Sequence, residues 1–531
     1  MSYIDVAEAY LHQDWSTALN SYWSPLYSWL LALAFAIIKP SPYWKFSVLH
    51  LVNFAIYLFA LGCVDFLLQE TSKFHRSREE AHDQGFVFLP QWAWTGLGIP
   101  LFIWLALYVN TVAIGTPDLI VAGIVYLSCG LLLRRRRRGL YWLNSALLGI
   151  ALGVGYLAKA VMFPLALVFL FVDLVAAGNL RRGLSHTLLA FLFFIVIAAP
   201  FVLALSQKKG RFTFGDAGKL NYAWAINKVP RSHWQGNEDA PGNGVPKHAT
   251  RKVFDSPPIY EFGDPVGGTY PVWYDPSYWY EGVVTRFAPS RQIKAILGKA
   301  AAYYELFFFN VSFGLLTGFL TLYLVSRRKW RVLRDLAPYS SSAIPALAGL
   351  GIYSVVAVEA RYIAPFVMLF WLALFSAARL PNSLEAKRLV SAVATSLVLL
   401  MVINVTASSK SEAFLTIKSL TTGENVSSHE HWRVARGLNQ MGVYPGERVA
   451  FLGQSAQAYW ANLASVRIVA EIEDKNVGIF WAADESLKIR MIETFRRTGA
   501  KVIVTQNPPP NSDAIGWKRI ADTSYYVYWL G

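Results

Sequence analysis

Long apolar runs separated by short polar connections make up most of the chain. Runs of about 17–25 apolar residues are long enough to cross a bilayer as helices. We predict such spans at 46–68, 92–113, 116–133, 140–157, 159–177, 185–206, 302–325, 340–358, 361–378 and 388–406. The apolar stretch 25–38 is shorter, which is typical of an interfacial or re-entrant helix. The pattern therefore predicts a polytopic α-helical membrane protein with about ten spans.

The pattern changes after the last apolar run. HWRVARGLNQMG and ESLKIRMIETFRRTGA have the period of amphipathic helices, whereas RVAFLG, RIVAEI and KVIVTQN are typical of strands. This mixture predicts a small α/β domain. Gly453 follows the first of these strands, but the segment contains no G-x-G-x-x-G motif. A structural or acceptor-docking role therefore fits the domain better than nucleotide binding.

These patterns divide the chain into five expected parts. They are a first extracytoplasmic loop with a juxtamembrane helix (1–45), a first part of the transmembrane bundle (46–206), a long extracytoplasmic loop rich in aromatic residues (207–301), a second part of the bundle (302–406) and an extracytoplasmic α/β domain (407–531).

Composition and charge support a membrane location and suggest an orientation. Charged residues make up only 16% of the 531 residues, whereas soluble domains carry roughly 25%. Lysines and arginines collect in one set of loops, which includes the run from Arg134 to Arg138, and such loops face the cytoplasm. We interpret this run and the net charge of +15 as topology signals rather than as a nucleic-acid site. Both long polar segments then lie outside a bacterial-type inner or plasma membrane.

Aromatic residues are concentrated in the long loop, whereas cysteines are rare. The stretch TYPVWYDPSYWYEG contains Trp273 and Tyr274. It is typical either of an interfacial belt that packs on headgroups or of a platform for a sugar or a lipid. Cys63 and Cys129 both fall inside apolar runs, so neither a disulfide framework nor a cysteine metal site is indicated.

Two carboxylates are candidates for chemistry at the outer membrane face. Ionisable groups at membrane depth are candidates for function by default. Asp5 lies in the polar opening segment, and Asp118 lies at the start of a predicted span in IGTPDLIVAG. Asp118 also fits a simple helix start, with Thr116 as the N-cap and Pro117 in the first turn.

Two cations are expected at the same face. Lys159 lies between two spans with almost no loop, where it either snorkels to the interface or binds an anionic phosphate. In VEARYIAPF, Glu359 and Arg361 could pair with each other beside Tyr362. The fork of an arginine also matches phosphate oxygens. Together these residues suit a lipid-phosphate sugar donor, with cations on the phosphate and a carboxylate as general base.

The order of these stretches resembles the GT-C superfamily of integral-membrane glycosyltransferases, and within it family 39, the protein O-mannosyltransferase and aminoarabinose transferase type. SPLYSWLLAL resembles the juxtamembrane helix after the first outer loop, and TPDLIVAG resembles the second acidic motif. GVGYLAKAVMFPLAL is similar to the Gly-rich segment with its lysine, and EARYIAPF to the RY-x-x-P segment. The likeness covers roughly residues 1–406.

The first acidic motif of this family departs from the pattern. The resemblance implies an acid in a pattern like D-x-x-x-Y soon after the first span. Tyr3 matches the tyrosine, which puts the matching acid two residues before Met1. We therefore expect either that Asp5 substitutes for this acid or that the chain lacks its first transmembrane span and the expected catalytic carboxylate.

The sequence thus predicts a glycosyltransferase, for hexosyl or pentosyl transfer, that moves a sugar from a polyprenyl-phosphate donor to an acceptor at the extracytoplasmic face. The resemblance implies inversion, with Asp5 and Asp118 as base and orienting group and with Lys159 and Arg361 on the phosphate. The alternatives are a non-catalytic or degenerate GT-C-like protein and a secondary transporter, although no internal repeat is visible. The acceptor (glycan, lipid or protein) and the cofactor are unknown; a divalent cation could bind only at the outer carboxylates, and no metal ligand set is predicted.

Overall fold

The computed structural model of the chain describes all residues except 82–85, 88, 110–111, 139–141, 178–179, 237–242, 264–266, 326–331, 423–428 and 511–515. The described residues form two compact units. The helical unit comprises 50–226 and 287–410, and the mixed unit comprises 1–49, 227–286 and 411–531. The five expected parts are therefore grouped differently, because the opening segment, much of the long loop and the C-terminal part share one unit.

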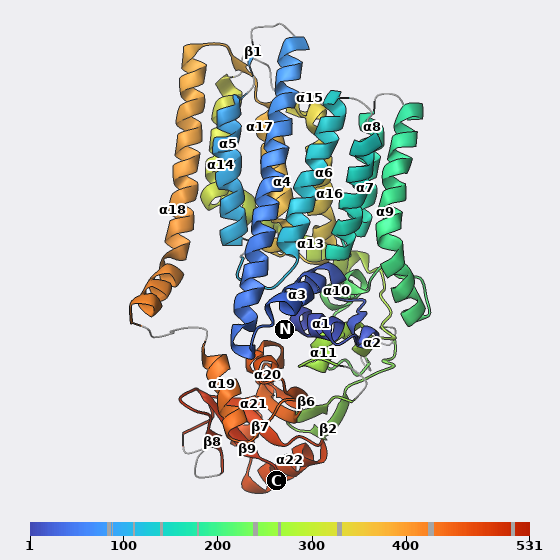
Figure 1. Ribbon diagram of the computed structural model, residues 1–531, viewed down its shortest axis with the longest axis vertical. Coiled ribbons are helices and arrows are strands. Elements are labelled where there is room, and N and C mark those ends of the chain that lie inside the picture. Colours follow the sequence, from blue (N-terminus) through green and yellow to red (C-terminus); the bar gives the residue numbers. More distant parts are fainter. Residues whose placement is uncertain are drawn as a thin grey trace. The chain divides into compact units, whose positions relative to one another are not determined.

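The helical unit consists almost entirely of long helices, many of which run side by side (Figure 1). In chain order these are α4 (Lys45–Ala81), α5 (Gln91–Trp104), α6 (Asp118–Arg138), α7 (Trp142–Ala158), α8 (Met162–Ala176), α9 (Leu180–Lys209), α10 (Ala217–Ala225), α13 (Pro289–Phe308), α14 (Asn310–Val325), α15 (Val332–Leu336), α16 (Ser340–Val356), α17 (Ala360–Ala377) and α18 (Leu384–Thr422). A π-helical turn, η2 (Leu105–Val109), continues α5, and the short strands β1 (Phe86–Val87) and β4 (Leu380–Pro381) pair antiparallel.

Apart from 302–325, each predicted span overlaps one long helix, but fewer helices are long and apolar enough to cross a membrane. Among the described residues five are long and apolar enough, or up to six if one bent pair is counted as a single span. The five are Pro42–Arg78, Arg181–Lys209, Arg334–Val356, Ala360–Ala377 and Leu384–Ala407. The apolar helices Pro25–Ile38, Gln91–Leu107, Trp142–Ala158 and Met162–Ala176 are shorter. The structure thus supports a polytopic helical protein without fixing ten spans.

Two predicted boundaries are wrong. The span 302–325 is not one helix, because α13 begins at Pro289 and meets α14 at a bend of 63°. Pro289 occupies the first turn of α13, where a proline is well tolerated. The connection between the predicted spans 46–68 and 92–113 is helical up to Ala81, since α4 continues through charged residues that form helices well.

The arginine run is ordered by buried acids within the helical unit. Arg135 forms an ion pair with Asp173, and both side chains are buried. Arg134 and Arg137 bind the Glu70 carboxylate, with N–O distances of 3.3 and 3.0 Å. A buried carboxylate needs such partners. These contacts connect the end of α6 to α4 and α8. They agree with a role of the arginine run as a topology anchor. The cytoplasmic location of the run stays a prediction.

The mixed unit combines short helices with a sheet. Its helices are α1 (Ser2–Leu11), α2 (Trp15–Ala18), α3 (Pro25–Ile38), α11 (Pro271–Tyr274), α12 (Pro276–Trp279), α19 (His429–Gln440), α20 (Tyr459–Leu463), α21 (Asp474–Ala482) and α22 (Glu485–Arg497). Its strands are β2 (Arg251–Asp255), β3 (Pro258–Glu261), β5 (Arg448–Gly453), β6 (Arg467–Glu473), β7 (Val502–Gln506), β8 (Lys518–Arg519) and β9 (Tyr525–Trp529).

The sheet contains strands from two distant parts of the sequence. Among the described residues its order is β2-β3-β6-β5-β7-β9-β8, with β6, β5 and β7 parallel and the other pairs antiparallel. The strands and helices predicted after residue 430 are present as β5, β6, β7, α19 and α22. The strands β2 and β3 come from the long loop, which was expected to stand apart from the α/β domain. Tyr260 pairs with Glu471 and Glu261 with Ala470, so this loop forms the edge of the sheet.

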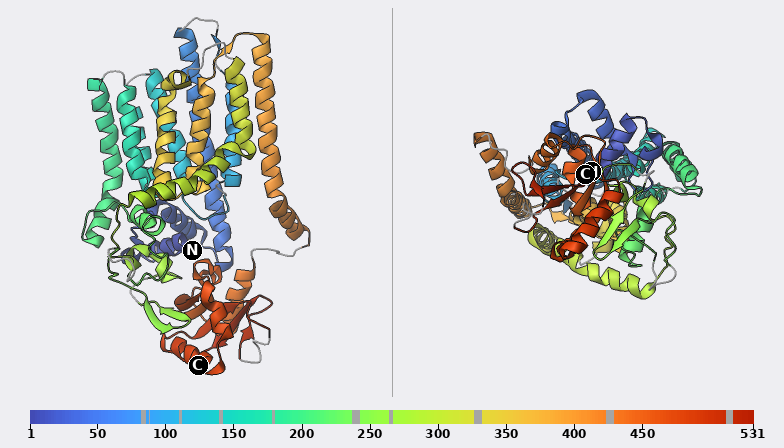
Figure 2. Two further views of the ribbon diagram at one scale, coloured as in Figure 1. Left: turned by 180° about the vertical axis from the view of Figure 1, so that it is seen from behind. Right: turned by 90° about the horizontal axis from the view of Figure 1, so that it is seen from below.

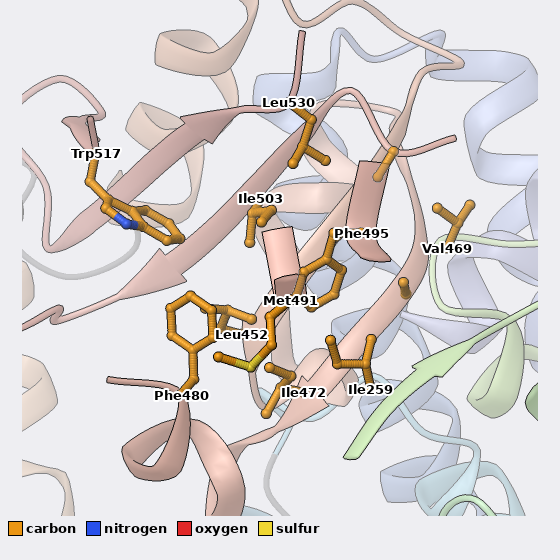
Figure 3. Close-up of a cluster of buried hydrophobic side chains, with 13 residues drawn as sticks. Ile259, Leu452, Val469, Ile472, Phe480, Met491, Phe495, Ile503, Trp517 and Leu530 are labelled. Atoms are coloured by element: carbon orange, nitrogen blue, oxygen red, sulfur yellow. The ribbon is translucent and has the colours of Figure 1, made fainter. Parts of the chain in front are cut away.

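Apolar residues of the sheet and of its helices form the core of the mixed unit. Met491 and Phe495 of α22 pack against Leu452, Ile472 and Ile503 of the parallel strands (Figure 3). Burying side chains of this size stabilises each by about 1.5–3 kcal/mol relative to exposure. Ile259 of β3 lies in the same cluster, so the long loop contributes to the core as well as to the sheet edge.

Helix α3 has the bounds expected for the short apolar helix 25–38. Its buried face includes Tyr27 and Leu31 and packs on α1, where the Ser28 hydroxyl donates to the Tyr3 carbonyl at 3.0 Å. Its other face exposes the large apolar residues Trp29, Leu33 and Ile37. An amphipathic or wholly apolar helix outside the spans is typical of a membrane interface, which stays our interpretation of α3.

Candidate functional site: an ionic cluster in the helical unit

Three helix ends bring charged side chains together in the helical unit. Asp118 is the first residue of α6, Lys159 lies in the connection between α7 and α8, and Arg361 lies in the first turn of α17. Lys159 Nζ lies 2.6 Å from Asp118 Oδ1, and Arg361 Nε lies 3.8 Å from Asp118 Oδ2. The structure therefore brings together the acid and the two cations that the sequence singled out.

Asp118 is the buried centre of this ionic cluster. Its side chain is only 3% exposed. The Thr116 hydroxyl donates to Asp118 Oδ2 at 2.9 Å, while Asp118 Oδ1 accepts from Lys159. Thr116 and Pro117 precede the helix as the sequence suggests. Asp118 is the first residue of α6, and it also binds Lys159. Because each of its oxygens already accepts a hydrogen bond, Asp118 is arranged to hold cations in place.

Lys159 and Arg361 also share an aromatic neighbour. Lys159 Nζ lies 3.4 Å from the ring centroid of Tyr362, and the Arg361 guanidinium carbon lies 4.9 Å from it. A cation over a tyrosine face is attracted by the ring quadrupole. Tyr362 thus helps to position both cations next to Asp118.

Glu359 is the fourth charged residue of the ionic cluster, and it is the exposed one of the two carboxylates. Its Oε2 atom accepts a hydrogen bond from Arg361 Nε at 2.8 Å and lies 2.8 Å from Nη2 as an ion pair, while Nη2 donates to the Tyr362 hydroxyl at 3.1 Å. The Glu359 side chain is 47% exposed. The ionic cluster therefore holds two carboxylates and two cations, of which one carboxylate is buried and the other faces outward.

Helix α13 supports the connection that leads to Glu359. It slants across the end of α16 (Figure 2). Lys299 Nζ donates to the carbonyls of Ser354 and Val356 at 3.2 and 2.7 Å, and Gln292 Nε2 donates to that of Val355 at 2.9 Å. A cation at the C-terminal carbonyls of a helix is favourable. The backbone just before Glu359 is thereby fixed by a helix that the sequence pattern did not reveal.

Asp5 lies in the mixed unit, in a buried network of neutral donors. The backbone N–H and the hydroxyl of Thr269 donate to its two oxygens at 3.0 and 2.9 Å, and Asn462 Nδ2 donates to Oδ1 at 2.6 Å. Asp5 thus joins α1 to the long loop and to α20. Burial raises the pKa of the Asp5 carboxyl, and the charge of the Met1 amino group and the backbone hydrogen bond from Thr269 oppose this rise.

Trp273 and Tyr274 lie together in the mixed unit but differ in exposure. Tyr274 is buried and donates its hydroxyl to the Thr17 carbonyl at 2.9 Å. Trp273 is half-buried, and its ring centroid lies 5.6 Å from that of Trp23 and 5.8 Å from that of Tyr22. The Trp23 indole N–H donates to the Trp273 carbonyl at 3.0 Å. The accessible aromatic surface is therefore formed by Tyr22, Trp23 and Trp273.

The sequence did not identify Thr269, Asn462, Tyr22 or Trp23 as site residues. Thr269 is separated from Asp5 by 264 positions and Asn462 by 457, so no local pattern connects them. The stretch NSYW did carry a signal for Trp23, since a tryptophan in a polar segment is typical of a surface that binds apolar rings.

No metal site is evident in the part of the chain that the structure describes. No group of three or more His, Cys, Asp or Glu side chains there could hold a metal ion. In the ionic cluster the two carboxylates are paired with Lys159 and Arg361. Lys159 and Arg361 are thus held by carboxylates, and an anion that binds these cations has to compete with Asp118 or Glu359.

No family model and no curated protein sequence matches the chain. Among solved structures, the apo oligosaccharyltransferase of Archaeoglobus fulgidus is similar with a TM-score of 0.52 and 14% identity, over 95% of this chain and 65% of that chain. ArnT from Cupriavidus metallidurans gives a TM-score of 0.40 and 13% identity in its apo state, over 100% of this chain and 92% of that chain. A further structure is that of ArnT bound to undecaprenyl phosphate, with the same TM-score and identity.

The likeness to the archaeal oligosaccharyltransferase concerns the fold. The fold of the chain is similar to that of this oligosaccharyltransferase, in agreement with the fold expected from the resemblance. It spans 65% of the length of that oligosaccharyltransferase chain, so nothing about the substrates or partners of the larger protein is carried over.

Proposed function

We propose that the chain is an integral-membrane glycosyltransferase that moves a sugar from a polyprenyl-phosphate donor to an acceptor at the extracytoplasmic face. The observation that carries this proposal is the ionic cluster, in which Lys159 and Arg361 are held around the buried Asp118. The GT-C fold supports the same general kind of protein. Ionisable groups next to apolar helices are expensive to keep unless they serve a function.

The two cations would hold the donor phosphate. When the bond between the anomeric carbon and the phosphate oxygen breaks, negative charge develops on the leaving phosphate. Lys159 supplies a point charge, and Arg361 supplies a planar fork that matches two phosphate oxygens. Positioned cations of this kind stabilise the charge that appears in the transition state.

The carboxylates would then have different tasks. Asp118 is proposed as a positioning residue, because a carboxylate whose oxygens accept from Lys159 and Thr116 is not free to take a proton. Asp5 is the base suggested by the sequence, but its three donors favour a positioning role within the mixed unit, and we propose that role for it.

The apolar and aromatic surfaces suit the remaining parts of a lipid-linked sugar. A groove of about 820 Å³ runs along α5 and α18, lined by apolar side chains that include Trp92, Ile99 and Val398. Such a surface can accept an isoprenoid chain. Trp273, with Tyr22 and Trp23, offers ring faces on which a sugar can stack, while the buried Tyr274 keeps this segment in place.

The proposal is tested by sugar release in membranes that contain the wild type, Asp118→Asn or Lys159→Met. We expect both variants to lower the transfer of labelled sugar from a polyprenyl-phosphate donor about 100-fold, the effect of removing one stabilising group for developing charge. Lys73→Met is a matched control, because Lys73 pairs with Glu70 outside the ionic cluster; its rate should stay near that of the wild type.

Full activity of Asp118→Asn and Lys159→Met at normal expression would contradict the assignment of the ionic cluster. If the wild type itself transfers no sugar, the chain is a non-catalytic protein with a GT-C fold, or a transporter.

A further inference from the structure

The contact between Glu359 and Arg361 occupies the edge of the guanidinium that a phosphate would use. Glu359 Oε2 accepts a hydrogen bond from Arg361 Nε and lies in ion-pair contact with Nη2, both at 2.8 Å. This is the edge at which arginine forms paired hydrogen bonds with carboxylates and phosphates alike. A phosphate can therefore bind this edge of Arg361 only after the Glu359 carboxylate has left it.

The two carboxylates of the ionic cluster differ in how easily they can leave. Asp118 is 3% exposed, and removing it from Lys159 would leave buried charges unpaired, which is strongly unfavourable. Glu359 is 47% exposed, and an ion pair at such a position contributes little, because water replaces the lost partner. The Glu359 side chain is thus the one that an incoming anion can displace.

The backbone around Glu359 allows such a movement of the side chain alone. Lys299 and Gln292 hold the carbonyls of Val356 and Val355 just before it, and Glu359 itself directly precedes α17. Displacement of the carboxylate into solvent therefore requires rotation of the side chain and no rearrangement of the helices.

We propose that Glu359 stands in for the donor phosphate on Arg361 when the site is empty, leaves for solvent when the donor binds, and returns to expel the lipid phosphate product. This inference rests on the proposed function. The donor is a phosphate diester with one negative charge. Its binding therefore replaces the single negative charge of the Glu359 carboxylate beside Arg361 by the single negative charge of the phosphate. The product is a phosphate monoester, which carries about −1.5 to −2 at pH 7. Competition from Glu359 therefore matters most for release of the product.

The experiment titrates undecaprenyl phosphate, as a probe, into the purified full chain in detergent, with undecaprenol as the probe that lacks phosphate. We expect Glu359→Gln to bind undecaprenyl phosphate about two- to fivefold more tightly than the wild type, the range that a partly exposed ion pair carries. Glu359→Ala should act in the same direction. Glu305→Gln removes an equal charge from an exposed position on α13 and should leave the affinity near that of the wild type.

A double variant distinguishes between two roles of Glu359. In one role the phosphate displaces Glu359 from Arg361, and in the other Glu359 only orients Arg361. Arg361→Gln should weaken binding, and adding Glu359→Gln to it should cause no further tightening, because the edge for which the two anions compete is gone. Equal or weaker binding by Glu359→Gln, while the wild type binds, would overturn this inference and would show that Glu359 orients Arg361. If the wild type does not distinguish undecaprenyl phosphate from undecaprenol, the proposed function fails together with this inference.

Discussion

Asp118 and Asp5 are both buried carboxylates, but their hydrogen-bond donors differ in charge. Asp118 faces Lys159 and Arg361, so burial of its negative charge is compensated. Asp5 faces the neutral donors of Thr269 and Asn462, and burial raises the pKa of its carboxyl. The hydrogen-bond donors of Asp5 are therefore neutral, whereas those of Asp118 include a lysine.

Asp5→Asn should change how the stability of the chain depends on pH. Because the pKa of Asp5 is raised in the folded state, the folded chain binds its proton more tightly than the unfolded chain does. The wild type should therefore lose stability relative to Asp5→Asn as the pH rises from about 4 through the raised pKa. The measurement is the melting temperature of both proteins in detergent between pH 4.5 and 8.

Asp522→Asn provides the control, because Asp522 is 88% exposed in the same unit. Its melting temperature should follow that of the wild type across the pH range. A difference between wild type and Asp5→Asn that is independent of pH would contradict the assigned surroundings of Asp5.

At the scale of the elements, α16 and α17 form the hairpin that positions Glu359 and Arg361. They pack closely at Gly349, where an added Cβ would lie 2.2 Å from Cδ1 of the buried Phe366. The sequence predicted both helices, since their apolar runs are long, but not this contact, because a glycine in an apolar run says nothing about its neighbour.

Gly349→Ala should destabilise this hairpin, whereas Gly351→Ala in the same helix should not. Overpacking against Phe366 costs about 1–3 kcal/mol. At Gly351 nothing lies within 4 Å of an added Cβ, and alanine favours a helix by about 0.5–1 kcal/mol. Thermal unfolding in detergent measures both effects. Equal melting temperatures for the two variants would show that α16 and α17 do not pack as described.

The elements also show where sequence patterns were informative. The strands β5, β6 and β7 could be predicted because each is a short, almost continuous apolar run, and α22 because it has one apolar face. The strands β2 and β3 were not predicted, because they are only five and four residues long and β3 pairs with the distant strand β6, where Tyr260 lies opposite Glu471. A short edge strand gains its stability from that distant partner and carries little signal of its own.

At the scale of the whole molecule, the sequence predicted the class of fold and the members of the ionic cluster. Asp118, Lys159 and Arg361 could be grouped because each lies where a predicted span begins or ends, and helix ends on one side of a bundle lie near one another. The composition of the mixed unit could not be predicted in the same way. It unites 1–49, 227–286 and 411–531, and contacts such as that between Asp5 and Asn462 join residues that no span places side by side.

The central claim is that the ionic cluster serves sugar transfer. It differs from the two alternatives, which are a transporter and a non-catalytic protein with the same fold. The most direct measurement uses the purified full chain in vesicles that carry a polyprenyl-phosphate donor with a labelled sugar, supplied with an envelope extract as the source of acceptor. We predict that the label leaves the lipid while polyprenyl phosphate accumulates, and that Lys159→Met slows both about 100-fold. Label that stays on the lipid, or that crosses the vesicle bilayer unchanged, would contradict the claim.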